Sequence, residues 1–325
     1  MSGSVTPQLV FVHGIGGLRD TEQQRREWLE ALADGARGAG HSDVISGLTR
    51  GWLAETRFAN YSDLFTDAEA QGGSAGVSDD PEGIAFLEDF VAALVDELGH
   101  QAREQGDRRA SAIVEDARAQ LPGVDDEQEQ GLGEPVRVLG RALTSLLQIP
   151  GLRGSAQWAS GLPLLGHLSQ VGRYLSRRRA ADGGLALDAR IRQRVLQGTD
   201  PERPLIVVAH SLGTVVAFEA LRGYEGQVPL LMTLGSPLAT AAAVLHRLVP
   251  QPPRTPARVE RWLNFWDRDD VVVGRPRIEK WMLPNADGVL PVTERVDSDG
   301  LWVHTATKYL RQSDVAGPLV EALKR

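Results

Sequence analysis

Ser211 stands where two segments of different character meet. Residues 205–208 are apolar and largely β-branched, as in a buried strand, whereas residues 211–224 suit a helix. Ala209 and Gly213 flank the serine at positions −2 and +2. Small residues there permit a sharp strand-to-helix turn that strains the serine backbone and lifts its hydroxyl clear of the sheet. The pattern predicts a nucleophilic serine, although a serine that only caps a helix would look similar.

The pentapeptide 209–213, Ala-His-Ser-Leu-Gly, resembles the nucleophile elbow G-x-S-x-G of the α/β-hydrolases, with Ala209 in place of the first glycine. The resemblance is to the lipase and esterase side of that superfamily. It covers residues 8–60 and 188–325, and residues 61–187 match only as a generic insertion. It implies that Ser211 is the nucleophile of a Ser-Asp-His triad, with His210 beside it in a structural role.

A glycine-rich run follows the first apolar segment, residues 9–12. It reads His13-Gly14-Ile15-Gly16-Gly17. In the family, the loop after an earlier strand turns a backbone N–H toward the nucleophile. The resemblance therefore implies an oxyanion hole made by the N–H groups of Ile15 and Leu212, with His13 ordering the loop. A phosphate-binding loop is the alternative, but the run fits neither G-x-G-x-x-G nor a P-loop.

The base of the triad is expected to be His304. In the family the acid and then the histidine follow the serine along the chain. Only His246 and His304 follow Ser211. His246 lies in an apolar, helix-like stretch, whereas His304 lies between the last strand candidate and the final helix. The resemblance implies a catalytic histidine at that second place.

The acid is chosen from three aspartates at the end of a strand candidate. Its role is to accept the imidazole Nδ1–H and so fix the tautomer of the histidine. Family members commonly show Asp, one residue and then two apolar residues, and the run from Asp269 to Val272 has that pattern. We predict Asp269 as the acid, with Asp270 as the second choice and Asp267 as the third.

The elements that must position these residues alternate between strand and helix patterns. This alternation predicts an α/β fold with a mostly parallel sheet of about six strands and helices on both faces. The resemblance implies the α/β-hydrolase fold with a helical lid. We divide the chain into a core, residues 1–104 and 181–325, and a helical insertion, residues 105–180. The strand candidates are residues 9–12, 55–60, 205–208, 230–234, 259–265 and 289–296.

The insertion is rich in leucine, and two interpretations of it stay open. Its apolar residues could form the underside of a lid that favours acyl chains, or they could simply pack onto the core. The run 177–179, three arginines, closes the insertion and is expected to be a solvated helix end. The candidate underside residues are Leu143, Leu146, Leu147, Leu152, Trp158, Leu162, Leu164, Leu165 and Leu168.

Composition excludes several kinds of function. The chain of 325 residues has no cysteine, which rules out thiolate catalysis and cysteine-ligated metals. Its net charge of −8 argues against a nucleic-acid partner. No histidine spacing suits a metal site, so we expect no metal and no cofactor. No apolar run is long enough for a membrane segment, and the first residues lack a secretory pattern. We therefore expect a cytoplasmic protein; its oligomeric state is not predicted.

These observations predict a serine hydrolase. We expect it to cleave carboxylic esters, lipid-like or acyl esters, through an acyl-enzyme on Ser211, with a small molecule or a lipid as substrate. An amidase, peptidase or thioesterase would use the same triad. A non-catalytic binding protein with a hydrolase-like fold is the remaining alternative. A complete set of serine, aspartate and histidine argues against it.

Overall fold

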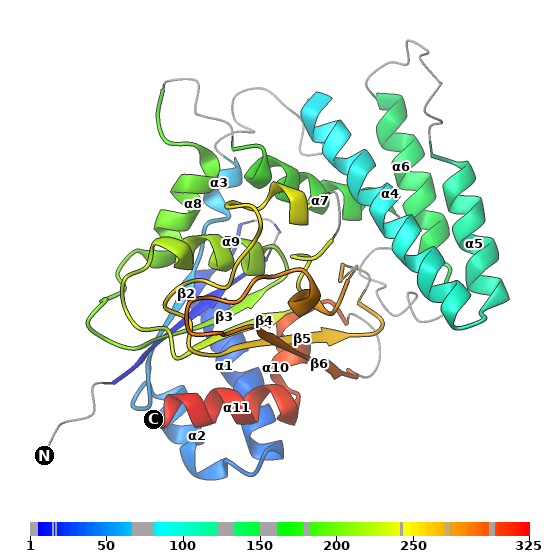
Figure 1. Cartoon of the computed structure of the whole chain (residues 1–325). Helices are drawn as coiled ribbons and strands as arrows, with labels where there is room; N and C mark the ends of the chain where they lie inside the picture. The colour runs from blue at the N-terminus through cyan, green and yellow to red at the C-terminus, as the bar shows by residue number, and fades with distance from the viewer. Residues whose placement is uncertain are drawn as a thin grey trace, which may run out of the picture.

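A central sheet of six parallel strands organises the protein (Figure 1). The computed structural model describes residues 6–14, 16, 18–66, 81–121, 133–149, 161–177, 183–240, 243–270, 272–273, 275–298 and 303–325. The strands are β1 (Gln8–Val12), β2 (Glu55–Ala59), β3 (Leu205–His210), β4 (Leu230–Leu234), β5 (Trp262–Asp267) and β6 (Pro291–Val296). Their spatial order is β2-β1-β3-β4-β5-β6. The predicted α/β class and the parallel sheet of about six strands are confirmed.

Helices surround the sheet, and their bounds are as follows. The α-helices are α1 (Thr21–Gly38), α2 (Ile45–Thr49), α3 (Asp63–Thr66), α4 (Pro81–Glu104), α5 (Arg108–Ala119), α6 (Gly133–Leu146), α7 (Gly161–Leu175), α8 (Leu187–Leu196), α9 (Leu212–Ala220), α10 (Ala306–Leu310) and α11 (Ser313–Leu323). The 3-10 turns are η1 (Ser42–Val44), η3 (Leu221–Gly223), η4 (Leu245–Arg247) and η5 (Ile278–Lys280). No helix of the described residues is both long enough and apolar enough to span a bilayer.

The central strands are buried and mostly apolar because both faces of the sheet are covered. All residues of β1 and β3 are buried, as expected for parallel strands between two helical layers. Side chains of a strand alternate between the faces, so Leu9 and Phe11 join a hydrophobic cluster with α1 and α11. Val10 and Val12 join a second cluster with α9 and the helices that follow β2. Figure 1 shows α1 and α11 on the opposite side of the sheet from α8 and α9.

Four of the helices between β2 and β3, α4 to α7, form a helical group that packs onto the core. α4 packs against α5, α6 and α7, and α7 also contacts α8. In Figure 1, α4, α5 and α6 lie side by side away from the sheet, and α7 lies nearer to α8 and α9. Residues 81–104, which the sequence-based division places with the core, form α4 and also pack against the insertion helices. The helical group thus includes α4, which begins at Pro81.

Candidate active site

The candidate site lies where the order of the sheet reverses. From β1 the chain adds β2 on one side, and it then returns to place β3 on the other side of β1. The loops that leave β1 and β3 therefore diverge at their carboxyl ends, and such a switch point is where open parallel sheets form a crevice. His13 and Gly14 follow β1 at this point, and Ser211 follows β3.

Ser211 has a strained backbone. Its φ is 56° and its ψ is −132°, a region that residues with a side chain rarely occupy and that costs about 1–3 kcal/mol. A close contact with the end of β1 imposes this turn. A Cβ on Gly213 would lie 2.3 Å from the carbonyl oxygen of His13 and 2.4 Å from that of Val12. The glycine at +2 is therefore required by packing against another strand, as well as by the turn itself.

The Ser211 hydroxyl faces a histidine that is itself bound to a carboxylate. His304 Nε2 lies 2.9 Å from Ser211 Oγ, and His304 Nδ1 lies 2.7 Å from Asp270 Oδ2. With the proton on Nδ1, the ring donates to Asp270 and its Nε2 accepts from the serine hydroxyl. All three side chains are buried, with residue exposures of 2% for Ser211, 6% for His304 and 3% for Asp270. The structure thus brings together Ser211 and His304, which the sequence analysis selected.

The carboxylate bound to His304 is Asp270, the second choice made from the sequence, and not Asp269, the first choice. The chain turns sharply after β5, where the Asp270 N–H donates to the Asp267 carbonyl at 3.1 Å and the Asp269 N–H donates to Asp267 Oδ1 at 2.9 Å. Successive residues in such a turn point in different directions. Asp270 therefore points to His304, while the Asp269 side chain, 33% exposed, lies 3.8 Å from Arg268.

Asp267, the third choice, has a separate role. Its Oδ2 accepts the backbone N–H of Ser298 at 2.6 Å and the Ser298 hydroxyl at 2.5 Å. Ser298 follows β6, so Asp267 ties the turn after β5 to the segment after the neighbouring strand. This pairing helps to hold the turn that carries Asp270.

Tyr309 completes the surroundings of the acid, and the sequence analysis missed it. Its hydroxyl donates to Asp270 Oδ2 at 2.7 Å and accepts the Asp267 N–H at 3.0 Å. The Val272 N–H donates to Asp270 Oδ1 at 3.1 Å. Two donors besides His304 therefore orient the Asp270 carboxylate. Burial, followed by the charge of Asp270, raises the pKa of Tyr309 and keeps it a donor. The signal in the sequence was weak: a tyrosine within the short helix α10, five residues after His304.

Gly235 explains how β4 contributes to the site without a side chain. The residue has a φ of 55°, which favours glycine. A Cβ there would lie 2.7 Å from Asp270 Oδ2 and 3.3 Å from His304 Nδ1. Any larger residue would therefore push apart the contact between the acid and the histidine.

His13 orders the loop after β1 as a neutral ring. Its Nδ1 lies 2.5 Å from the Gly14 carbonyl oxygen, and its Nε2 accepts the Tyr61 N–H at 3.2 Å. The Tyr61 hydroxyl donates to the His13 carbonyl. Burial, and next the charge of Arg19, lowers the pKa of His13 from 6.5 to about 3. A neutral ring is also the form that accepts from Tyr61, so geometry and pKa agree.

The predicted oxyanion donors are only partly described. Ile15 lies outside the described residues. Leu212 is the first residue of α9, and the first N–H groups of a helix have no partner within the helix. Its N–H is therefore free of the helical ladder at the end of the helix where negative charge is favoured.

A cavity of about 290 Å³ opens beside Ser211. Its described lining includes His210 and His304, and a polar wall of Arg19, Gln24 and Glu27. Arg19 Nη1 donates to Gln24 Oε1 at 3.0 Å, and Gln24 Nε2 donates to Glu27 Oε2 at 2.8 Å. The cavity is therefore small, and one wall is polar and charged.

The leucines of the insertion lie elsewhere. Leu143, Leu146, Leu165 and Leu168 are at most 2% exposed and belong to the hydrophobic core. None of them lines the cavity at Ser211. Of the two interpretations of these residues, packing onto the core is the one that the structure supports. Leu152 and Trp158 lie outside the described residues, as do the side chains of Leu162 and Leu164.

His210 packs beside the candidate base. Its ring centroid lies 4.7 Å from that of His304, and the ring of Trp28 meets it edge-on at 6.4 Å. Burial, followed by the neighbouring His304, lowers the pKa of His210 well below its ordinary value. A neutral ring here supports His304 by contact and adds no competing charge.

No assignment comes from similarity or from a metal. Comparisons of the chain with protein-family models, with curated proteins and with solved structures found no match. Among the residues that the structure describes, no three histidines, aspartates or glutamates are grouped to hold a metal ion.

We predict that His13 makes the stability of the protein pH-dependent. Between pH 6.5 and about pH 3 the unfolded chain binds a proton on His13 that the folded protein does not bind. Because the unfolded state binds more protons there, the free energy of unfolding falls as the pH is lowered, by up to about 1.4 kcal/mol per pH unit. Urea unfolding at pH 7.5 and pH 5.5 measures this loss.

The comparison is made with His13→Gln, whose side-chain oxygen still offers Tyr61 an acceptor. The free energy of unfolding of this variant is expected to be lower than that of the wild type at pH 7.5. It is expected to fall by less than that of the wild type between pH 7.5 and pH 5.5. His100→Gln, at an exposed position on α4, controls for replacing a histidine. Equal losses in wild type and His13→Gln would contradict the neutral ring.

Proposed function

We propose that the protein is a serine hydrolase that cleaves carboxylic esters through a Ser211–His304–Asp270 triad. One observation carries the proposal: a single buried imidazole lies between a strained serine hydroxyl, at 2.9 Å, and a carboxylate, at 2.7 Å. A helix N-cap serine needs no such partners, and Ser211 makes no side-chain capping hydrogen bond to α9. Acyl transfer by a serine requires a nucleophile, a base and an acid that orients the base, and these three side chains contact one another in that order.

In the proposed reaction, His304 Nε2 takes the Ser211 proton as Oγ attacks the ester carbonyl. The π electron pair moves to the carbonyl oxygen, which becomes an oxyanion. The Leu212 N–H stabilises it, together with the Ile15 N–H implied by the family resemblance. The intermediate collapses as His304 returns the proton to the departing alcohol. Water then repeats the sequence on the acyl-enzyme, releasing the acid and restoring the serine hydroxyl.

Asp270 supports the charge that forms on His304 during each half of the reaction. Its carboxylate holds Nδ1–H, so Nε2 is the nitrogen left to accept from Ser211. Tyr309 and the Val272 N–H bind the same carboxylate and keep it oriented. Such preorganised groups need not rearrange as the imidazolium forms, which is how a buried site lowers a barrier.

We assign the chain to the α/β-hydrolase fold as part of this proposal. Two features support the assignment: a parallel sheet with its nucleophile at the end of a strand beside the switch point, and a Ser-Asp-His order along the chain. The glycine-rich loop of the family also follows the neighbouring strand, β1. No comparison with known proteins adds to this assignment.

The acyl group that fits best is short or polar. The cavity of about 290 Å³ is at the small end for organic ligands. A long alkyl chain in the cavity would remove water from Arg19, Gln24 and Glu27 on its wall. The chain would offer these side chains no hydrogen bonds in return, which makes its binding unfavourable. A preference for lipid-like esters rested on a leucine-lined underside of the insertion, and four of those leucines, Leu143, Leu146, Leu165 and Leu168, are buried in the core instead.

We predict that a fluorophosphonate probe forms a covalent adduct on Ser211 of the folded protein. The probe reacts with a serine that an adjacent base has activated. Peptide mass spectrometry of the labelled chain locates the adduct. Ser211→Ala and urea-unfolded wild type are the controls, and both are expected to stay unlabelled. Folded wild type without an adduct would overturn the proposed function.

We predict that Asp270→Asn lowers kcat for a p-nitrophenyl ester by about 10³–10⁴-fold. An amide does not accept the Nδ1–H as a carboxylate does, so the histidine loses its orientation and the stabilisation of its charged form. Asp269→Asn, one residue away, is the matched control and is expected to leave kcat little changed. The reverse result would restore Asp269 as the acid.

We predict that kcat/KM is highest for the p-nitrophenyl esters of acetate and butyrate. It is expected to fall by about tenfold or more toward the octanoate ester, because the added methylene groups exceed the cavity. Initial rates at a series of substrate concentrations give the comparison. A rise with chain length would contradict the short acyl site while leaving the triad intact.

A further inference from the structure

We propose that Gln170 of α7 is a positioning residue for the reaction, because it holds the loop that follows β1. The inference rests on the proposed function and extends it to a residue outside the triad. In this proposal the helical insertion contributes to catalysis by supporting the site. The insertion does not need to open and close as a lid for this role.

Gln170 reaches the loop through a direct hydrogen bond. Its Oε1 accepts the Gly16 N–H at 3.0 Å, and its Nε2 lies 3.5 Å from the Gly16 carbonyl oxygen. Gly16 has a φ of 140°, which favours glycine. Gly16 lines the cavity beside Ser211, and in the sequence it follows Ile15, whose N–H the family resemblance implies as an oxyanion donor. A side chain from a distant helix therefore satisfies a backbone N–H in the wall of this cavity.

The same face of α7 is tied to the core at two further places. Gln170 and Arg173 are three residues apart on α7, so they share one side of the helix, and Arg177 lies just beyond its end. Arg173 Nη2 donates to the Phe65 carbonyl at 2.8 Å, and its guanidinium lies 5.5 Å from the centre of the Phe65 ring. Phe65 belongs to α3, so this contact joins α7 to the segment after β2.

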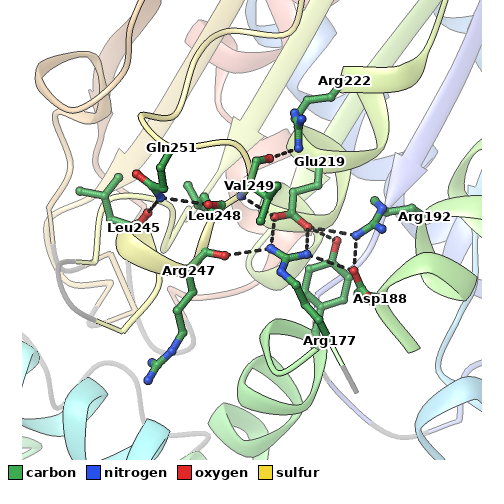
Figure 2. A network of polar contacts seen from close by, with 11 residues as sticks. Arg177, Asp188, Arg192, Glu219, Arg222, Leu245, Arg247, Leu248, Val249 and Gln251 are labelled. Atoms are coloured by element: carbon green, nitrogen blue, oxygen red, sulfur yellow. Dashed lines mark hydrogen bonds and ion pairs between the residues drawn. The ribbon is translucent and has the colours of Figure 1, made fainter. Parts of the chain in front are cut away.

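Arg177 forms the third tie, through a partly buried ion network (Figure 2). Its guanidinium binds both carboxylate oxygens of Glu219, at 2.6 and 3.2 Å, and Asp188 at 3.0 Å. Glu219 belongs to α9 and its side chain is 1% exposed. Arg192 of α8 binds the same two acids, and the Tyr174 hydroxyl donates to Glu219 at 2.9 Å. Arg177 is therefore not the solvated helix end that the sequence analysis expected.

The opposite face of α7 packs into the helical group. Leu168, Val171 and Leu175 are buried there. A Cβ on Gly172 would lie 2.6 Å from the ring of Phe86 on α4, so the two helices are in close contact. α7 thus lies between the insertion helices and the core and is held on both sides. Many contacts fix the position of α7 relative to the loop after β1. The hydrogen bond from Gly16 to Gln170 therefore holds Gly16 at a fixed place relative to α7.

Oxyanion donors act only when they are already aimed at the developing charge. Without an acceptor for the Gly16 N–H, the loop gains other conformations, and the donor beside it spends less time in place. The loss is felt in the transition state and not in ground-state binding, so kcat falls while KM is unchanged. This split separates positioning from substrate binding.

The test compares Gln170→Met, which removes the acceptor at similar size, with Gln170→Glu, which keeps it. Gln120→Met is the matched control. Gln120 also links two insertion helices, by donating to Ser145 on α6 at 3.0 Å, but it makes no contact with the loop. For p-nitrophenyl acetate, Gln170→Met is expected to lower kcat by about 10–100-fold, somewhat less than outright loss of a donor. KM is expected to stay within about twofold.

Hydrogen exchange provides the second readout, since it does not depend on activity. Peptides that span residues 10–20 are expected to exchange faster in Gln170→Met, and at the wild-type rate in Gln170→Glu and Gln120→Met. If Gln170→Met does not fold, Gln170→Asn replaces it, because the shorter side chain withdraws its amide from Gly16.

The outcomes separate the two proposals. Wild type that takes no fluorophosphonate on Ser211 overturns the proposed function, and the catalytic role of Gln170 with it. Labelled wild type with equal kcat in Gln170→Met and Gln120→Met overturns this inference alone. A change confined to KM, or wild-type exchange in Gln170→Met, also overturns it.

Discussion

The close approach of the turn after β3 to the end of β1 is the contact on which the site depends. Gly213 lies against the carbonyl groups of Val12 and His13, with no space for a Cβ. That packing holds Ser211 in its strained backbone and brings the loop after β1 beside it. Gly14 is equally close, because a Cβ there would lie 2.6 Å from Ser211 Cβ. Ser211 and the loop after β1 are thus packed together as one unit.

Burial then sorts the histidines around this unit by the charge they can carry. Desolvation lowers the pKa of His13 to about 3 and that of His210 well below its ordinary value. Both rings are therefore neutral at physiological pH. The His13 ring is bound to backbone groups, and the His210 ring is packed against aromatic rings. His304 lies against the Asp270 carboxylate instead. Of the three rings, it is therefore His304 that the proposed reaction uses to move the Ser211 proton.

The helices of the insertion also help to hold the site in position through their packing. Its helices share one hydrophobic cluster with β1, β3 and α9, so they are part of the core and not a separate unit. The ion network at Arg177 joins α7 to α8 and α9 in a region where unpaired charges would be costly (Figure 2). Through Gln170 the same helix reaches the loop after β1. Rigid support of this kind suits a site whose groups must be in place before the reaction begins.

The sequence by itself determined the α/β class, the strands and the serine at the end of β3, because each depends on local patterns: apolar runs, alternation with helices and small residues around a turn. It also singled out His304 through its place along the chain. The tertiary structure decided what local patterns do not contain. The turn after β5 points Asp270, not Asp269, at the histidine, since neighbouring residues in a turn face different ways. Whether the insertion leucines meet substrate or core, and that Gln170 meets Gly16, depend on contacts between segments far apart in the chain.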